Sequence, residues 1–478
     1  MITDRDNVKC WYVIIFAFVA HLPLITLYPV NFEFTFSEGA KYLINFDQKI
    51  VEDYFFNQAN TFAYSFIVGL INKIFPIENL LIYTRLLSAT SYFFFGLAFI
   101  NIFKYYKIKF QCYIFLIFFF LNPIIWTYGY RGTPDLLSSS LAIYCFSNII
   151  TCNNKFNFKF FFNYFVLGIS ICVKPFGLIY LGIIILLDYK NNLLQIIKKY
   201  LFLIILTLLI PVIYFLLIKF NFNFFLIPLN FQTQVTFIHS NFLYVFFGYS
   251  VFLSILVFPL TFNIKYLKKK INLFIMFLLF LLSFFFYNII STPSAELNFG
   301  FFQNLINIKI IAIFAFVLFS FFLIFFIEII KRKIIINYKL IFIIFFYIFI
   351  LSLTRPAQRY LITILPIVFL LILINLKLLK KSMLFLVITF IYIPLNLIIT
   401  INFYFTAHNN QIIISYLRNE QLLSKTDPGK LYPHSYHFFG KDLTKRQYII
   451  SDVPGKLILK SFYFNNIINQ RYYYINKL

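Results

Sequence analysis

The sequence predicts an all-α polytopic membrane protein of about 13 transmembrane helices, followed by a small mixed α/β domain at its carboxyl end. The composition is the first reason: 62% of the residues are hydrophobic and 12% are charged, whereas soluble domains average about half apolar and a quarter charged. The second reason is that continuous apolar runs of about 20 residues recur along the chain, the length that crosses a hydrocarbon core of ~30 Å. A membrane β-barrel would instead show segments of about 10 alternating residues.

The formal net charge is +25 over 478 residues, and such a charge can indicate a nucleic-acid-binding protein. Its distribution argues against nucleic acid as a partner, because the lysines form short clusters between apolar runs, as membrane topology requires. The five cysteines lie in or beside the spans, with neither a disulfide nor a metal-binding spacing. The first apolar run is too long for a removable signal peptide and lacks a small-residue cleavage site, which predicts a retained anchor.

The basic clusters predict the direction of each span. The apolar segment 61–75 has only about 15 residues and is followed by Pro76, so we expect it to lie at the outer surface without crossing. With that choice every dense basic cluster falls inside, the amino end lies inside, and the carboxyl end lies outside. The predicted spans are 11–30, 80–103, 110–126, 135–150, 201–217, 242–262, 271–290, 310–330, 340–353, 361–376 and 383–403, with two more flanking a break at Lys174-Pro175.

This assignment divides the chain into two parts. Residues 1–403 form the predicted transmembrane domain, and residues 404–478 form the predicted extracytoplasmic domain. The second part is more polar and carries the turn signals Asp427-Pro428-Gly429 and Pro454-Gly455, which favour a small α/β fold.

The first outer loop, residues 31–76, is the first candidate for a functional site. The chain has 16 acidic residues, and the loop concentrates Glu33, Glu38, Asp47, Glu52 and Asp53 within a short segment. Such a cluster beside an apolar bundle indicates either a site or a solvated loop that only links two spans.

Two later segments place charges at the same predicted face. Asp135, in YGYRGTPDLLSSS, either complements the dipole of a helix that starts at Pro134 or pairs with Arg131 along a substrate path. Lys174 either extends to the interface or faces that path.

Arg355 and Arg359, in LTRPAQRYLITILP, flank a proline between two predicted spans. They either anchor lipid headgroups or hold a phosphate through forked, charge-assisted hydrogen bonds. Cations that hold a phosphate, with a carboxylate as general base, suit transfer from a lipid-linked phosphosugar. The apolar spans would hold the polyprenyl tail.

These segments resemble, in order, the motifs of the multi-span glycosyltransferases of the GT-C fold, in particular the lipid A aminoarabinose transferases and protein O-mannosyltransferases. SEGAKYLINF resembles their first-loop signature, which implies Glu38 as catalytic base and Tyr42 as its companion. YRGTPDLL resembles their second outer loop, with Asp135. LGISICVKPFGLIYLG resembles their glycine-lysine-proline break, with Lys174.

Two further segments extend the resemblance. IENLLIYTRLLSATSYFFFGLAF resembles the second span of the family, with Arg85 at its start. TRPAQRYLITILP is similar to a late arginine-tyrosine-proline motif, with Arg359 and Tyr360. The matches cover roughly residues 11–190 and 350–370, in the order that the family shows.

The chain departs from the family at two positions. An aspartate is usual where Ser37-Glu38 stands here, and the longer side chain leaves Glu33 and Asp135 open as alternative bases. The family's lysine- or histidine-proline-proline-leucine-tyrosine stretch reads NTFAY at 60–64, which keeps Tyr64 but lacks a phosphate-holding lysine. That role would pass to another cation, namely Arg131, Lys174 or Arg359.

The resemblance implies an inverting glycosyltransferase that moves a sugar from a polyprenyl-phosphate donor to a lipid, glycan or protein hydroxyl. It implies a bacterial inner-membrane protein whose active site faces the periplasm and which builds the cell envelope, for example lipopolysaccharide. Some members of the fold use a divalent metal and others do not, so a metal stays open. The implied catalytic residues are Glu38 and Asp135, and the implied substrate-binding residues are Tyr42, Tyr64, Arg131, Lys174, Arg355, Arg359 and Tyr360.

Two other classes of protein share this composition: a flippase or transporter of lipid-linked oligosaccharide, and a polymerase or ligase of surface polysaccharide. A flippase would line its central spans with cations. Here Glu328, Lys339 and nearly every other ionisable residue lie at a predicted span end. This pattern favours chemistry at one face over passage through the membrane.

Overall fold

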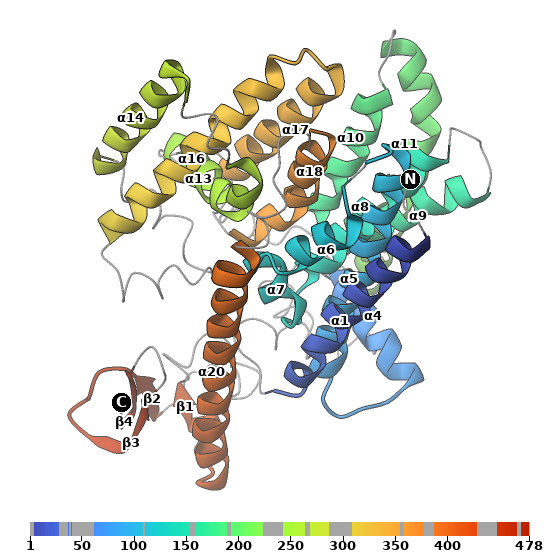
Figure 1. Cartoon of the computed structure of the whole chain (residues 1–478). Coiled ribbons are helices and arrows are strands. Elements are labelled where there is room, and N and C mark those ends of the chain that lie inside the picture. The colour runs from blue at the N-terminus through green and yellow to red at the C-terminus, as the bar shows by residue number, and fades with distance from the viewer. Residues whose placement is uncertain are drawn as a thin grey trace.

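The structure is a computed structural model. It describes residues 4–27, 37, 40, 62–108, 110–152, 158–188, 193–222, 242–262, 268–285, 308–353, 358–375, 387–427, 447–465 and 470–477. This part of the chain is mostly helical, with a small sheet at the carboxyl end (Figure 1). The longer helices are α1 Asp4–Ile25, α4 Phe62–Ile74, α5 Leu81–Tyr105, α6 Cys112–Phe120, α7 Pro123–Gly129, α8 Pro134–Thr151, α9 Phe158–Val173, α10 Leu178–Asp188, α11 Leu193–Phe222, α13 Phe242–Thr261, α14 Lys270–Phe285, α16 Ile308–Ile330, α17 Ile335–Ser352, α18 Leu361–Ile374 and α20 Ile393–Asn419.

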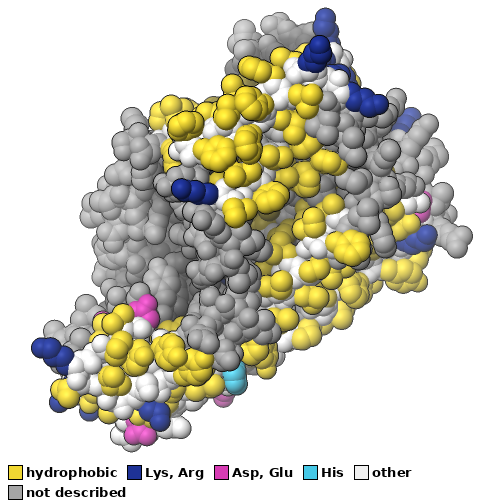
Figure 2. Space-filling model, turned by 60° about the vertical axis from the view of Figure 1, so that its left-hand side comes forward, with side chains coloured by type: hydrophobic (Ala, Val, Ile, Leu, Met, Phe, Trp, Pro, Cys, Tyr) yellow, Lys and Arg dark blue, Asp and Glu magenta, His cyan; other side chains and the backbone are white. Residues whose placement is uncertain are grey.

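The chain is an integral membrane protein. Within the described ranges, five helices are long and apolar enough to cross a membrane, or six if the bent pair α6–α7 forms one span. Other apolar helices have 10–17 residues. Hydrophobic side chains cover much of the described surface in the view of Figure 2. Among the described residues, Phe158, Phe220 and Phe285 are highly exposed. Such a surface is stable in lipid and unfavourable in water. The count of about 13 spans and their orientation remain predictions.

The predicted span 110–126 is not one straight helix. It consists of α6 and α7, which are bent by 70°. The physical cause is Pro123, which lacks the N–H that would continue α6 and instead starts α7. Asn122 stabilises the bend, because its side chain accepts from the Ile124 N–H at 3.3 Å and donates to the Leu256 carbonyl at 2.8 Å.

The predicted break at Lys174-Pro175 is confirmed. α9 ends at Val173, Lys174 is extended, and a 3₁₀ turn, η2 Pro175–Gly177, leads into α10. Proline explains the break, since it disfavours a helical conformation in the preceding residue and cannot donate a backbone hydrogen bond.

Helix α8 packs between α5 and α9 (Figure 1). It is buried around most of its circumference, which requires small or apolar residues on every face. Towards its carboxyl end, amides join the three helices: Asn101 donates to Asn148 at 2.9 Å, and Asn148 donates to Asn163 at 3.1 Å. These hydrogen bonds fix how far α5 and α9 are shifted along α8.

Helix α20 leaves the bundle and leads to the sheet (Figure 1). A π-helical turn, η7 Ile388–Tyr392, precedes it, and the helix then runs to Asn419. The predicted domain boundary between 403 and 404 therefore falls inside a continuous helix. At one end of the bundle α1 ends, α8 begins and α20 emerges towards the sheet. We call this end the 'sheet end'.

The sheet has four strands in the order β1-β2-β4-β3. β1 pairs with β2 in parallel, and the other two pairs are antiparallel. Ile450 and Ile475 from the sheet pack with Ile413 and Leu417 of α20, so the last turns of that helix provide the apolar partner that a small sheet needs. The strands are β1 Thr426–Asp427, β2 Tyr448–Ser451, β3 Ile458–Asn465 and β4 Gln470–Lys477.

The two ends of the bundle differ in charge. Exposed basic residues lie after α5, before α14 and after α16, including Lys107, Lys268 and Lys333. These positions are opposite the sheet end, because α5 and α16 run away from it and α14 runs towards it. The described basic clusters thus share one end, as the positive-inside rule would produce.

Candidate functional site

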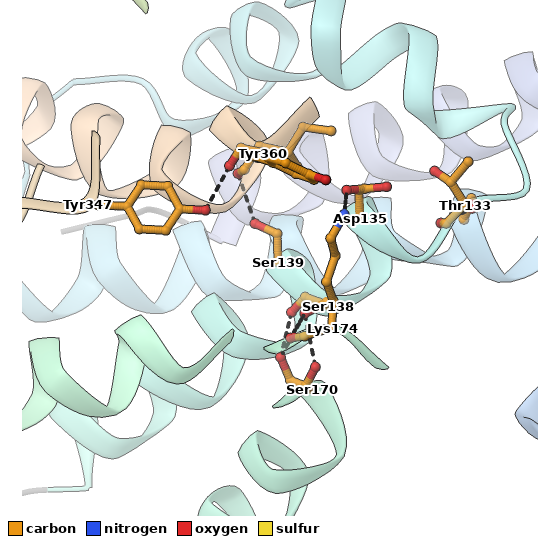
Figure 3. Close-up of polar contacts among 10 residues, drawn as sticks. Thr133, Asp135, Ser138, Ser139, Ser170, Lys174, Tyr347 and Tyr360 are labelled. Atoms are coloured by element: carbon orange, nitrogen blue, oxygen red, sulfur yellow. Dashed lines mark hydrogen bonds and ion pairs between the residues drawn. The ribbon is translucent and has the colours of Figure 1, made fainter. Parts of the chain in front are cut away.

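A buried ion pair lies at the sheet end of the bundle (Figure 3). The Lys174 ammonium donates to Oδ1 of Asp135. The residues are 6% and 3% exposed, and they come from the break after α9 and the first turn of α8. A buried ion pair is weak evidence for stability, because desolvation offsets the attraction. Ionisable residues that are paired inside a membrane bundle tend to mark a functional site, and this pair lies at a helix break.

Aromatic rings surround the Lys174 ammonium. Its Nζ lies 4.6 Å from the ring centre of Tyr360 and 5.4 Å from that of Phe176. The Arg359 guanidinium carbon lies 5.5 Å from the same Tyr360 ring. Two cations thus lie against one aromatic ring, an arrangement that cation–π attraction supports. The group holds one carboxylate and two cations.

Two serines place Lys174. Ser138 Oγ donates to the carbonyls of Ser170, at 2.9 Å, and Lys174, at 3.2 Å, while Ser170 Oγ donates back to the Ser138 carbonyl at 2.8 Å. These contacts join α8 to the last turn of α9 and to the break that follows it. Gly177 allows the close approach, because a Cβ there would lie 2.6 Å from Ser170 Oγ.

Three side chains hold the start of α18, next to Arg359 and Tyr360. Tyr347 donates to the Tyr360 carbonyl at 2.9 Å and Tyr180 to the Thr363 carbonyl at 2.9 Å (Figure 3 shows the first). Ser139 donates to the Ile362 carbonyl at 3.0 Å. Pro366, inside α18, explains the last contact, because it has no N–H for the carbonyl four residues earlier.

We expect Ser138→Ala to lower the free energy of unfolding by about 1 kcal/mol, since it removes two hydrogen bonds between helices in the membrane. The matched control is Ser320→Ala, because the Ser320 hydroxyl, equally buried, donates only to Val317 of its own helix. Thermal unfolding in detergent measures both. Equal losses in the two variants would contradict a special role for Ser138.

Arg85, in the second turn of α5, is fully buried and holds the end of α1. Its Nη1 donates to the carbonyls of Leu24, Ile25 and Leu27 at 2.9, 3.2 and 2.7 Å. A helix end leaves carbonyls without partners, and a cation there also complements the helix dipole.

The same turns of α5 hold two other segments of the sheet end. The Tyr64 hydroxyl, from α4, donates to the Thr84 carbonyl and lies 3.1 Å from Ser88 Oγ. Ser88 in turn donates to the Thr133 carbonyl at 3.1 Å, two residues before Asp135. Gly132 lies against Thr84, where a Cβ would come within 2.2 Å of Oγ1. The start of α5 therefore holds the segments on both sides of residues 28–61: Arg85 binds the end of α1, and Thr84 binds Tyr64 of α4. Through Ser88 it also positions the start of α8.

The structure brings together four of the predicted site residues: Asp135, Lys174, Arg359 and Tyr360. Tyr64 lies nearby, in one hydrophobic cluster with Leu137 and Val173. Leu137 is two residues after Asp135, and Val173 directly precedes Lys174.

Arg131 is placed differently. Its guanidinium carbon lies 5.5 Å from the Tyr128 ring, and no contact in the described part joins it to Asp135, the pairing that the sequence left open. Three predicted residues, Glu38, Tyr42 and Arg355, lie outside the described residues.

Sequence reasoning missed the residues that position the pair. Arg85 was noted only as part of a motif, and the serines of α8 were not singled out. A signal existed in SSS at 138–140, because three polar residues in a buried span need partners. No comparable signal indicated that Arg85 would reach back to α1.

A metal site is not formed by the described residues, among which no three His, Cys, Asp or Glu side chains come together. The acidic residues of the first outer loop lie outside the described ranges. The group at Lys174 has the composition of an anion site, with more cations than carboxylates.

No protein-family model and no curated protein matches the chain. Among solved structures, the chain is similar to the crystal structure of ArnT from Cupriavidus metallidurans in the apo state, with 11% sequence identity and a TM-score of 0.47. The similarity covers 87% of this chain and 72% of that one. At this identity and TM-score it does not by itself establish a shared fold or function.

Proposed function

We propose that the chain is a membrane glycosyltransferase of the GT-C kind, which moves a sugar from a polyprenyl-phosphate donor to an acceptor hydroxyl with inversion. One observation carries the proposal. Asp135, Lys174 and the Arg359-Tyr360 pair stand in three separate motifs that resemble that family, and they lie in one group around a buried ion pair at one end of the bundle.

The proposed chemistry follows from the charges of this group. The lipid phosphate leaves with added negative charge, and Lys174 and Arg359 stabilise it through charge-assisted hydrogen bonds. The hydrophobic surface of the helices accommodates the polyprenyl tail. A carboxylate of the first outer loop, with Glu38 as first candidate, takes the proton from the acceptor hydroxyl as general base. Asp135 is the less suitable base, since Lys174 occupies one of its oxygens.

We also propose where the reaction takes place and which acceptor it uses. The acceptor is a lipid, glycan or protein hydroxyl at the periplasmic face of a bacterial inner membrane, where cell-envelope polymers such as lipopolysaccharide are built. Nucleic acid is not a partner.

A flippase is the main alternative, and the position of the buried charges favours the enzyme. Among the described residues, the buried charged side chains are Arg85, Asp135 and Lys174, and all three lie at the sheet end. A path for a phosphate through the bundle would need polar or charged groups along its length. A polysaccharide polymerase or ligase would use the same geometry and would differ in its product.

We expect Glu38→Gln to abolish sugar transfer while the protein still folds and binds the lipid donor, because glutamine keeps the shape and loses the basicity. Mass spectrometry of surface glycolipid and glycoprotein, in cells that lack the chain and in cells that express each variant, measures the product. This comparison also identifies the sugar and the acceptor.

Glu78→Gln is the matched control, because Glu78 is an exposed acid close to the same loop. It should leave the product unchanged. Full product from Glu38→Gln would remove Glu38 as the base, and identical glycans with and without the intact chain would remove the transferase proposal.

A further inference from the structure

The surroundings of Lys174 are complete without any ligand. Its ammonium is bound by one carboxylate, Asp135, and lies against the rings of Tyr360 and Phe176. A lysine this deeply buried needs a compensating anion, and Asp135 supplies it. A phosphate that binds the Lys174 ammonium must therefore compete with the Asp135 carboxylate, which is already bound to it.

The start of α8 has further features of an anion site. Thr133 is the residue before the helix, yet its side chain makes no capping hydrogen bond. Its hydroxyl is buried and finds no hydrogen-bond partner among the described residues. Figure 3 draws Thr133 beside Asp135, with its oxygens on the side of the carboxylate. The first N–H groups of a helix favour an anion, so Thr133, the helix start and Lys174 together can bind one.

We propose that Asp135 is the resident anion of a phosphate-binding site, and that the phosphate of the lipid-linked donor binds by displacing Asp135 from Lys174. The ammonium exchanges one negative partner for another, and no covalent bond changes. Arg359 lies against Tyr360, the ring that also contacts Lys174. It adds a second positive charge for the phosphate. This inference rests on the proposed function for the identity of the donor.

Displacement of Asp135 predicts the direction in which removal of this carboxylate changes the affinity for phosphate. Asp135 and a bound phosphate are both negative, and like charges that share one cation repel each other. The carboxylate therefore lowers the affinity of the site for phosphate. If Asp135 instead only held Lys174 in place for the ligand, its removal would weaken binding.

The experiment measures the binding of a polyprenyl monophosphate and, separately, of inorganic phosphate to the purified full chain in lipid nanodiscs. Asp135→Asn keeps the size of the side chain and removes its charge. We expect it to bind the polyprenyl monophosphate at least about tenfold more tightly than the wild type. Lys174→Gln should lose binding in either background.

Controls separate this effect from general charge and from misfolding. Glu328→Gln removes an acid that pairs with Lys269 at the opposite end of the bundle, at 2.7 Å, and should leave binding unchanged. Asp135→Ala serves as a second uncharged variant, and thermal unfolding checks that each protein is folded.

A gain for both probes supports the site for phosphate in general, and a gain for the lipid probe alone supports a lipid-phosphate site. Unchanged or weaker binding of both probes in the folded Asp135 variants would overturn the proposal. Sugar transfer is not needed for this readout. The binding site can therefore hold where the transferase proposal fails, and the transferase can hold where the displacement fails.

Discussion

Lys174→Met is expected to lower the free energy of unfolding by about 3–5 kcal/mol, because it leaves the Asp135 carboxylate buried without its counter-ion. Methionine keeps most of the side-chain length, so packing against Tyr360 and Phe176 changes little. The same variant should lose binding of a polyprenyl monophosphate. Thermal unfolding in detergent and ligand binding measure the two effects.

The double variant Lys174→Met/Asp135→Asn separates stability from binding. Removing both charges should restore most of the lost stability, since replacement of a whole buried pair is often close to neutral. Phosphate binding should stay lost, because the cation is still absent. A double variant as unstable as Lys174→Met alone would show that the lysine stabilises the fold through something other than the pair.

Lys269→Met is the matched control for Lys174. Its ammonium also pairs with a carboxylate, Glu328, but the two side chains are 48% and 19% exposed. An exposed pair contributes about 0–1 kcal/mol, so this variant should be nearly as stable as the wild type. A comparable loss in both variants would contradict the importance of burial at Asp135.

The sequence predicted the membrane class and the broken helix at Lys174-Pro175, because both follow from local chemistry. Apolar runs of sufficient length have few alternatives to a membrane span, and proline interrupts a helix wherever it stands. The bend between α6 and α7 has the same local cause, but Pro123 was absorbed into one apolar run. A proline inside an apolar run therefore indicates a bend as well as a break.

The sequence could not predict which charges would meet. Arg131 lies four residues before Asp135, and this spacing suggested a pair, yet the structure pairs Asp135 with Lys174, 39 residues away. The outcome depends on how α8 and α9 pack, to which the contacts of Ser138 with Ser170 and of Asn148 with Asn163 contribute. Such contacts have no period or spacing in the sequence. The placement of Glu38 relative to this pair remains a prediction.

Arg85→Ala is expected to lower the free energy of unfolding by about 3–5 kcal/mol, because three carbonyls at the end of α1, two of them buried, lose a charged donor. The effect should also be local. Hydrogen exchange should accelerate in residues 21–27 and in the first turn of α5, while α14, which packs against α16, should exchange as in the wild type.

Arg418→Ala tests whether any arginine near the sheet end would behave in this way. Arg418 is exposed in the last turn of α20, and its loss should change neither stability nor exchange. Arg85→Lys should fall between the two, because an ammonium donates to carbonyls but lacks the width of a guanidinium. If Arg85→Ala matched Arg418→Ala, the end of α1 would be held by other contacts. Arg85 would then not be what positions the end of α1.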